Sequence, residues 1–345
     1  MKQDLAVAVG AFAMSVAGPG QVGDQTAMAP QAIQEEAFVR IGGIEQWISI
    51  RGRNGENPVV LLLHGGPGFP NAPFAPAFEG WQKDFTLVDW DQRGAGRTFG
   101  RNGADGSGPL SIERLTQDGL ELAQYLKTRL RKDKVVVFAL SFGSVVGLRM
   151  VHARPELFAA YVGSGQFVSA AEGDALGYQL TLAAARAAGS KEAVKELEAL
   201  GPPPWRDVKA RSAAKGWASR MTKADDPAVK MNVREMLKAL PDYSDADREN
   251  LWKGVAFSTE PLVRDALSFD ARALGQRFPI PLFVFQGADD LNTPTPLVKS
   301  WFADLAAPVK DMVVVEHASH GAFYTHRELL GRFLAERVRP LAVAK

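Results

Sequence analysis

The amino-acid sequence predicts an α/β fold, with a mostly parallel, doubly wound sheet and a helical segment inserted into it. Short apolar runs, typical of strands buried on both faces, recur along the chain, and amphipathic helical patterns separate several of them. The alternation stops between residues 167 and 272, where helix signals follow one another without a strand. The 345 residues are 46% hydrophobic and 23% charged, which is ordinary for a folded globular chain.

Strands are expected in the following order. Residues 37–41 and 44–50 alternate apolar and polar side chains around Gly42-Gly43, which predicts an opening hairpin. Six apolar runs then predict the buried strands of a parallel sheet, at residues 59–63, 85–88, 135–140, 159–162, 282–285 and 312–315.

Helix signals occur between these strands and in the inserted segment. Ser111 is a candidate N-cap for a helix over residues 112–130. In the insertion, Ser190 is expected to cap a helix that ends at Gly201, and Asp226-Pro227 to open another that Pro241 stops. The predicted organisation is a tail (1–34), a core (35–166 and 273–345) and a helical cap (167–272).

The N-terminal tail resembles a targeting segment. Residues 5–17 are apolar, follow Lys2, and end in small residues that would suit cleavage by a signal peptidase. The stretch is too short to span a bilayer, and Asp4 weakens the positive region before it. If residues 1–17 are a signal segment, the protein is expected to be periplasmic or secreted, and otherwise cytoplasmic.

Charge and residue types exclude several functions. A formal net charge of +1 gives no field that favours nucleic acid or an anionic membrane. The chain has no cysteine, and its five histidines show no metal-binding spacing, so neither a metal nor a thiol nucleophile is expected. We expect no cofactor and a small-molecule or short-peptide substrate; the sequence leaves the oligomeric state open.

Ser141 is the candidate nucleophile. It follows the predicted strand 135–140 directly and precedes a helical pattern, within Ala139-Leu140-Ser141-Phe142-Gly143. A strand-to-helix turn that lifts a serine hydroxyl above a sheet needs small residues two positions away on each side. Gly143 meets this need and Ala139 nearly does, although a serine in this place can also simply cap the helix.

A glycine turn after the first buried strand is the second element of the predicted site. His64-Gly65-Gly66-Pro67-Gly68 allows the backbone to approach a ligand closely. A tetrahedral oxyanion needs two N–H donors, and the expected pair is Gly66 together with Phe142, the residue after the nucleophile. His64 is expected to be structural.

The acid and the base are expected after the last two strands, in the order serine, acid, histidine. Asp290 lies in the loop after the strand 282–285, with Asp289 as its competitor. His320 follows the strand 312–315 and precedes Gly321-Ala322, with His317 as the alternative base. We therefore expect Ser141, Asp290 and His320 to form a catalytic triad.

These motifs carry a family resemblance. The His64–Gly68 segment together with Asp89-Trp90-Asp91-Gln92-Arg93-Gly94-Ala95-Gly96-Arg97-Thr98 resembles the proline iminopeptidase branch of the α/β-hydrolase superfamily, over residues 37–166 and 275–338. The resemblance implies a serine hydrolase that acts through an acyl-enzyme, and an aminopeptidase that releases a small apolar N-terminal residue. It assigns Ser141 as nucleophile, Asp290 and His320 as its partners, and Gly66 and Phe142 as oxyanion donors.

Two departures from the family's pattern bear on the substrate. The nucleophile turn lacks the common Gly-Gly-Ser-Trp-Gly form, and no Trp-x-x-Trp-Glu stretch is present to hold a free amine. Glu172, Asp174 and Glu260 remain possible amine anchors, and Trp205 is a candidate pocket residue in the cap. The alternatives are an esterase or amidase of the same fold without free-amine recognition and, more remotely, a non-catalytic ligand receptor.

Overall fold

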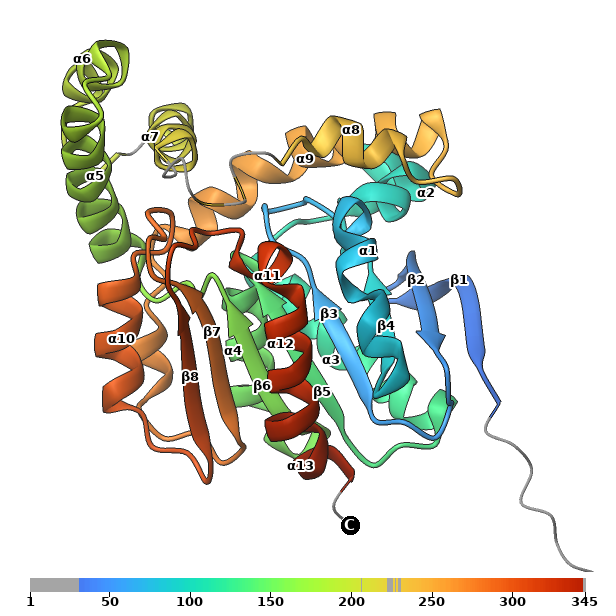
Figure 1. Cartoon of the computed structure of the whole chain (residues 1–345). Coiled ribbons are helices and arrows are strands. Elements are labelled where there is room, and N and C mark those ends of the chain that lie inside the picture. The colour runs from blue at the N-terminus through green and yellow to red at the C-terminus, as the bar shows by residue number, and fades with distance from the viewer. Residues whose placement is uncertain (1–30, 206, 222–225, 227, 229–230, 344–345) are drawn as a thin grey trace, which may run out of the picture.

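A computed structural model describes residues 31–205, 207–221, 226, 228 and 231–343, and an eight-stranded sheet forms its centre (Figure 1). The strands are β1 (Ile33–Ile41), β2 (Ile44–Gly52), β3 (Val59–Leu63), β4 (Thr86–Trp90), β5 (Val135–Leu140), β6 (Phe158–Ser164), β7 (Leu282–Gly287) and β8 (Lys310–Val315). Their order across the sheet is β1-β2-β4-β3-β5-β6-β7-β8. Strand β2 is antiparallel to β1 and β4, and all other neighbours are parallel, which confirms the predicted α/β sheet.

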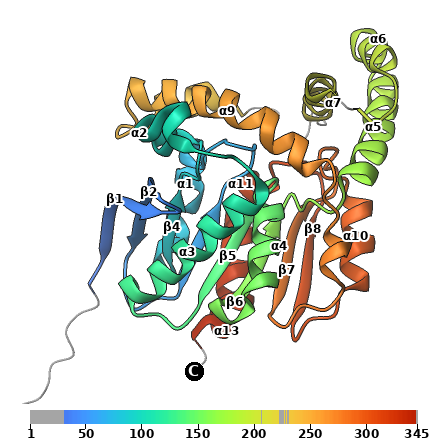
Figure 2. The same ribbon diagram turned by 180° about the vertical axis from the view of Figure 1, so that it is seen from behind.

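Helices cover both faces of this sheet. The α-helices are α1 (Ala75–Phe78), α2 (Gly96–Ser107), α3 (Ile112–Leu130), α4 (Gly143–Ala153), α5 (Ala170–Ala187), α6 (Lys191–Leu200), α7 (Val208–Arg220), α8 (Val233–Lys238), α9 (Asp245–Ala266), α10 (Thr295–Asp304), α11 (Ala322–Thr325), α12 (Arg327–Phe333) and α13 (Arg339–Val343). Helices α3, α4 and α10 lie on one face, and α1, α11 and α12 on the other (Figures 1 and 2). The sheet is thus the middle layer of three.

The continuous apolar runs follow from this layering. In β5, Val135 and Val137 belong to the core beneath α3 and α4, whereas Val136 and Phe138 belong to the core beneath α1 and α12. Because successive side chains of a strand point to opposite faces, a strand covered on both sides is apolar at every position. The prediction of six buried strands is wrong for β8: its residues 311–314 are only half-buried, because β8 is the edge strand and pairs with β7 alone.

Helices α5 to α9 lie between β6 and β7 in sequence and over the carboxyl end of the sheet in space (Figure 1). Ser111 and Ser190 cap α3 and α6 as expected. The helix expected to open at Asp226-Pro227 is α8, and Asn232 caps it instead, accepting from the N–H groups of two residues in its first turn. Positions 227, 229 and 230 lie outside the described residues.

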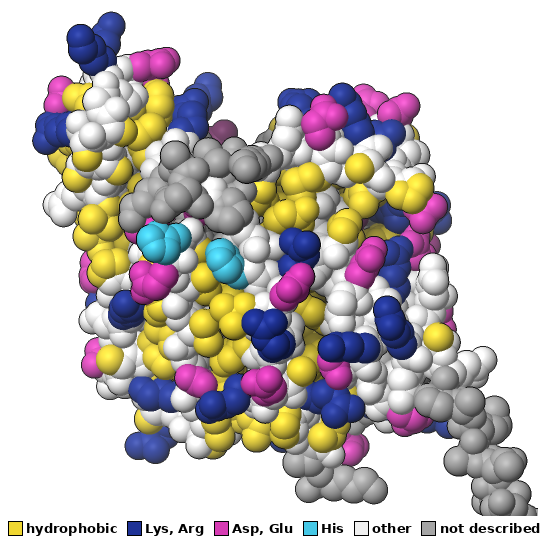
Figure 3. All heavy atoms as spheres, viewed as in Figure 1, with side chains coloured by type: hydrophobic (Ala, Val, Ile, Leu, Met, Phe, Trp, Pro, Cys, Tyr) yellow, Lys and Arg dark blue, Asp and Glu magenta, His cyan; other side chains and the backbone are white. Residues whose placement is uncertain are grey.

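Strand β1 begins at Ile33, so the last two residues of the predicted tail, 33 and 34, belong to the sheet. The expected signal segment, residues 1–17, lies outside the described residues. Among the helices that are described, none combines the length and the apolar character that a bilayer span requires. Basic and acidic side chains are interspersed over the face shown in Figure 3, as the small net charge leads one to expect.

A buried ion pair supports the loop after β4. The Arg93 guanidinium donates to Asp118 in α3 through Nε (2.7 Å) and Nη2 (3.2 Å), and also to the carbonyl oxygens of Gly42 and Ser107. Gln46 Nε2 donates to the same carboxylate at 2.9 Å. The side chains of Arg93 and Asp118 are 2% and 0% exposed. The charge cluster therefore ties the first hairpin, the β4 loop and α3 together.

Asp118→Asn is expected to lower the free energy of unfolding by about 3–5 kcal/mol, because it leaves the buried Arg93 guanidinium without its counter-charge. Urea unfolding followed by circular dichroism measures this loss. Glu35→Gln is the control, since the Glu35–Arg129 pair is exposed and its removal is expected to change the stability little. Equal effects of the two substitutions would contradict the structural role assigned to Asp118.

Candidate active site

Ser141 lies in a sharp turn between β5 and α4. Its backbone is left-handed, with φ of +49°, and its N–H donates to the carbonyl oxygen of Ser164 at the end of β6 (2.9 Å). A Cβ at Gly143 would lie 2.6 Å from the carbonyl oxygen of His64 and 2.7 Å from that of Leu63, so only glycine fits there. This is the strand-turn-helix geometry that the sequence motif predicted.

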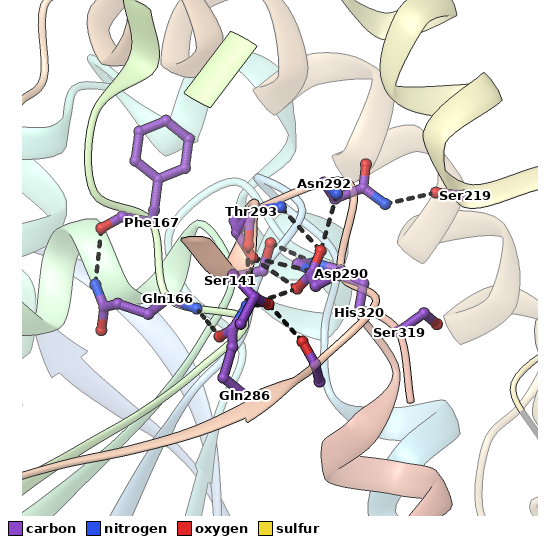
Figure 4. A network of polar contacts seen from close by, with 12 residues as sticks. Ser141, Gln166, Phe167, Ser219, Gln286, Asp290, Asn292, Thr293, Ser319 and His320 are labelled. Atoms are coloured by element: carbon purple, nitrogen blue, oxygen red, sulfur yellow. Dashed lines mark hydrogen bonds and ion pairs between the residues drawn. The ribbon is translucent and has the colours of Figure 1, made fainter. Parts of the chain in front are cut away.

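Three predicted side chains meet above the carboxyl end of the sheet (Figure 4). His320 Nε2 lies 2.9 Å from Ser141 Oγ, and His320 Nδ1 lies 2.8 Å from Asp290 Oδ2. A carboxylate only accepts hydrogen bonds, so Nδ1–H donates to Asp290 and Nε2 is left to accept the serine hydroxyl. Asp290 follows β7 and His320 follows β8. Because these neighbouring strands are parallel, both residues lie at the carboxyl end of the sheet.

Asp290 has a completely buried side chain and a full set of donors. Its Oδ1 accepts from the N–H groups of Asn292 (2.8 Å) and Thr293 (2.9 Å), and its Oδ2 accepts from the Thr293 hydroxyl (2.7 Å) as well as from His320. Burial acts to raise the pKa of Asp290, but His320 and the Thr293 donors outweigh it and hold that pKa below its ordinary value. The carboxylate is therefore the stable form beside the histidine.

Two residues that the sequence motifs did not indicate, Gln286 and Gly165, support this arrangement. Gln286, at the end of β7, donates from Nε2 to Asp290 Oδ2 (3.1 Å) and accepts from the N–H of Gln166, which follows β6 (3.0 Å; Figure 4). A buried glutamine in an otherwise apolar strand is a signal that could have indicated it. Gly165 has φ of +58°, and a Cβ there would lie 2.7 Å from His320 Cε1, so glycine leaves the imidazole its space.

The glycine turn after β3 lies beside Ser141. Gly66 has φ of +110°, and a Cβ there would lie 2.7 Å from the backbone nitrogen of Phe69. Within the part of the chain that the structure describes, no group accepts a hydrogen bond from the N–H of Gly66 or of Phe142. Both residues line the same cavity as Ser141. Two backbone donors are therefore available beside the serine hydroxyl.

The cavity above Ser141 has a volume of about 440 Å³. Its wall includes five phenylalanines, Phe69, Phe74, Phe142, Phe167 and Phe323, beside smaller apolar and polar side chains. Its charged side chains, among the residues described, are Arg211 and Lys215 of α7 and the titratable His320. The described lining holds no aspartate or glutamate.

None of the four residues predicted to bind substrate, Glu172, Asp174, Glu260 and Trp205, lines this cavity, and Asp174 is paired with Arg211 and Lys215. Glu172 is paired with Arg272, and Glu260 with Arg264 on the same helix face, and both carboxylates are exposed. Trp205 packs edge-on against Tyr178, and its indole N–H donates to the Gly201 carbonyl oxygen (3.0 Å). Each has a local partner instead, so the structure does not bring these residues to Ser141.

Among the described residues, no group of three or more histidine, aspartate or glutamate side chains is arranged to hold a metal ion.

His64 is buried, and both nitrogens of its imidazole form hydrogen bonds with the backbone. Nδ1–H donates to the Gly65 carbonyl oxygen (3.0 Å), and Nε2 accepts from the N–H of Gln92 (3.1 Å). Burial lowers the pKa of His64 to about 4.

The pKa of His64 predicts a loss of stability in acid. In the unfolded chain a histidine has a pKa of about 6.5, so between pH 6.5 and 4 the unfolded state binds a proton that the folded state does not. The free energy of unfolding should therefore fall as the pH decreases through this window, by about 3 kcal/mol in all at about 1.4 kcal/mol per pKa unit. Urea unfolding at pH 7, 5.5 and 4.5 measures it.

His64→Gln should remove this part of the pH dependence. The matched control is His152→Gln, because His152 is an exposed histidine on α4. An unchanged pH dependence in His64→Gln would show that the buried imidazole is not responsible.

Comparisons with known proteins agree with this geometry. The model of the alpha/beta hydrolase family matches residues 60–332. "Probable aminopeptidase YbaC" of Bacillus subtilis is 24% identical over 311 residues, 89% of this chain and 96% of that protein. "Probable proline iminopeptidase" of Streptomyces coelicolor is 28% identical over 298 residues, 79% and 85% of the two chains. The crystal structure of the proline iminopeptidase of Mycobacterium smegmatis shares the fold, with a TM-score of 0.63 at 16% identity over 90% of this chain and 99% of that one.

From the family match, the sheet order and the strand-turn-helix at Ser141, we conclude that this chain belongs to the α/β hydrolase family and is a hydrolase.

Proposed function

We propose that this hydrolase cleaves carboxylic esters or amides through an acyl-enzyme on Ser141. The observation that carries the proposal is the hydrogen-bonded series Ser141 Oγ, His320 and Asp290, with distances of 2.9 and 2.8 Å. A serine hydroxyl is a weak nucleophile by itself and becomes effective when a histidine held by a carboxylate accepts its proton.

The proposed reaction uses the groups already described. His320 Nε2 takes the proton of Ser141 as Oγ attacks the substrate carbonyl carbon, and the N–H groups of Gly66 and Phe142 stabilise the oxyanion. The tetrahedral intermediate collapses and expels the alcohol or amine, which receives the proton from His320, and the acyl group remains on Oγ. A water molecule, deprotonated by His320, then attacks the acyl carbon. The second tetrahedral intermediate collapses and releases the acid, and His320 returns its proton to Ser141 Oγ.

The inserted segment, residues 167–272, is proposed as the cap that selects the substrate. Helices α7 and α9 contribute to the cavity wall through residues such as Ser212, Lys215, Val255 and Val263. Because a buried cation repels a second one, the Arg211 and Lys215 side chains disfavour a free ammonium group in this cavity. This supports an esterase or amidase without free-amine recognition as the first candidate.

An aminopeptidase is the second candidate. Two relatives at 24% and 28% identity carry aminopeptidase and proline iminopeptidase names, and they match most of this chain. A small apolar N-terminal residue, proline above all, would suit the phenylalanine-rich wall of the cavity.

Ser141→Ala is expected to lower kcat/KM for a short-chain nitrophenyl ester by at least about 10³-fold, because the nucleophile is lost. A fluorophosphonate should add one phosphonyl group to Ser141 in the wild type and none in the variant, as intact-protein mass spectrometry would detect. Ser268→Ala, at an exposed serine outside the cavity, is the control. Full activity in Ser141→Ala would overturn the mechanism, and an unreactive wild type would favour a ligand receptor instead.

The two candidates differ in how they treat a blocked amine. With proline anilide, N-acetylproline anilide and a nitrophenyl ester as substrates, the basic cavity predicts that N-acetylation does not reduce kcat/KM. A preference of tenfold or more for the unblocked anilide would identify an aminopeptidase and reject the first candidate.

A further inference from the structure

Two basic side chains of α7 face the cavity that contains Ser141. Arg211 and Lys215 are four residues apart, so they lie on the same side of the helix, and both line the cavity together with His320. Neither belongs to the proposed triad or to the oxyanion donors. The presence of two cations in this cavity wall therefore needs its own explanation.

The two cations share one described carboxylate. Arg211 Nε donates to Asp174 Oδ2 of α5 (2.7 Å), and Lys215 Nζ lies 3.2 Å from Asp174 Oδ1. Lys215 Nζ also donates to the backbone carbonyl oxygen of Asn292 (2.8 Å), which brings hydrogen bonding but no negative charge. Two positive charges thus contact a single carboxylate, and the next negative charge that acts on Lys215 is that of Asp290, which is engaged with His320.

Burial makes this excess charge costly. The side chains of Asp174, Arg211 and Lys215 are only 7%, 11% and 22% exposed. A buried charge without a counter-charge is unfavourable, and the burial of Lys215 accordingly lowers its pKa. An anion that entered the cavity would supply the missing charge.

The guanidinium of Arg211 offers the matching geometry. Only its Nε is used for Asp174, and among the described residues no group accepts from its two terminal nitrogens. A guanidinium presents paired donors that suit a carboxylate, and hydrogen bonds between charged groups are stronger than neutral ones. The cavity thus combines a charge excess with unoccupied donors.

We propose that Arg211 and Lys215 bind a carboxylate of the substrate, so that the enzyme acts on esters or amides that carry an acidic group in addition to the bond that is cleaved. This inference rests on the proposed serine hydrolase activity and adds the substrate class. A cavity of about 440 Å³ is large enough for a small substrate of this kind.

Two matched substrate pairs test the proposal. On the acyl side, mono(4-nitrophenyl) glutarate is compared with its methyl ester, which has nearly the same shape but no charge. On the leaving-group side, 4-acetoxybenzoate is compared with methyl 4-acetoxybenzoate. We expect the charged member of one pair to have a kcat/KM about tenfold higher or more, and that pair identifies the side on which the carboxylate is bound.

Arg211→Gln is the diagnostic variant, because glutamine can still donate to Asp174 but carries no charge. It should lower kcat/KM for the charged substrate more than for its neutral partner, and so abolish the preference for the charged member. Arg211→Lys should retain part of the preference. Lys209→Gln is the matched control, since Lys209 is an exposed cation on the same helix and does not line the cavity. Thermal unfolding verifies that each variant is folded.

The wild type alone can refute the proposal, whatever the folding of the variants. Turnover of the neutral esters that depends on Ser141, with no preference for the charged member of either pair, would overturn carboxylate binding and leave the serine hydrolase intact. Failure to cleave any of the four esters, with Ser141 unreactive to a fluorophosphonate, would overturn both. A preference that persists in Arg211→Gln would also contradict the role given to Arg211.

Discussion

The left-handed backbone of Ser141 is the constraint on which the candidate site depends. A residue with a side chain adopts this conformation only when its surroundings hold it there. Here the N–H of Ser141, directly after β5, donates to the carbonyl oxygen of Ser164. Because residue 143 is glycine, α4 can begin in contact with the carbonyl oxygens of Leu63 and His64 at the end of β3. The close packing of β3, β5 and α4 therefore raises the Ser141 hydroxyl above the sheet. Gly143 and Gly165 lack a side chain where neighbouring atoms lie close to the backbone, namely the carbonyl oxygens after β3 and the His320 ring.

The acid loop joins the sheet to the inserted helices. The N–H of Asn292 donates to Asp290, and its carbonyl oxygen accepts a hydrogen bond from Lys215 Nζ. Its side-chain Nδ2 donates to the hydroxyl of Ser219 in α7 (3.0 Å; Figure 4). The wall of the cavity and the carboxylate that orients His320 therefore share one short loop. A movement of α7 would act on both, since hydrogen bonds connect them.

The proposed chemistry and the proposed substrate choice reside in different parts of the chain. The serine, acid, histidine and backbone donors lie at the ends of core strands, where the fold of the family places such groups. Arg211 and Lys215 belong to the insertion, and the named aminopeptidases are similar to this chain at no more than 28% identity. One architecture supports many substrates because the residues that contact the variable part of the substrate can change without disturbing the reacting groups.

The sequence by itself determined the local features. Apolar runs identified the parallel strands, Ser111 and Ser190 identified helix starts, and the spacing around Ser141 identified the turn, because periodicity, capping and glycine requirements act over a few residues. The order of Ser141, Asp290 and His320 along the chain also predicted that these three side chains would meet in one site.

Only the tertiary structure decided what lies across the cavity. Glu172, Glu260 and Trp205 have the right chemistry for a pocket. In the structure Glu172 pairs with Arg272, Glu260 pairs with Arg264, and Trp205 donates to the Gly201 carbonyl oxygen. Gln286 donates to nearby Asp290 but is itself bonded to the N–H of Gln166, which lies 120 residues earlier in the sequence. Arg211 of α7 faces the cavity and is bonded to Asp174 of a separate helix, α5. The direction in which an inserted helix faces depends on packing against the whole core, and no local pattern in the sequence encodes it.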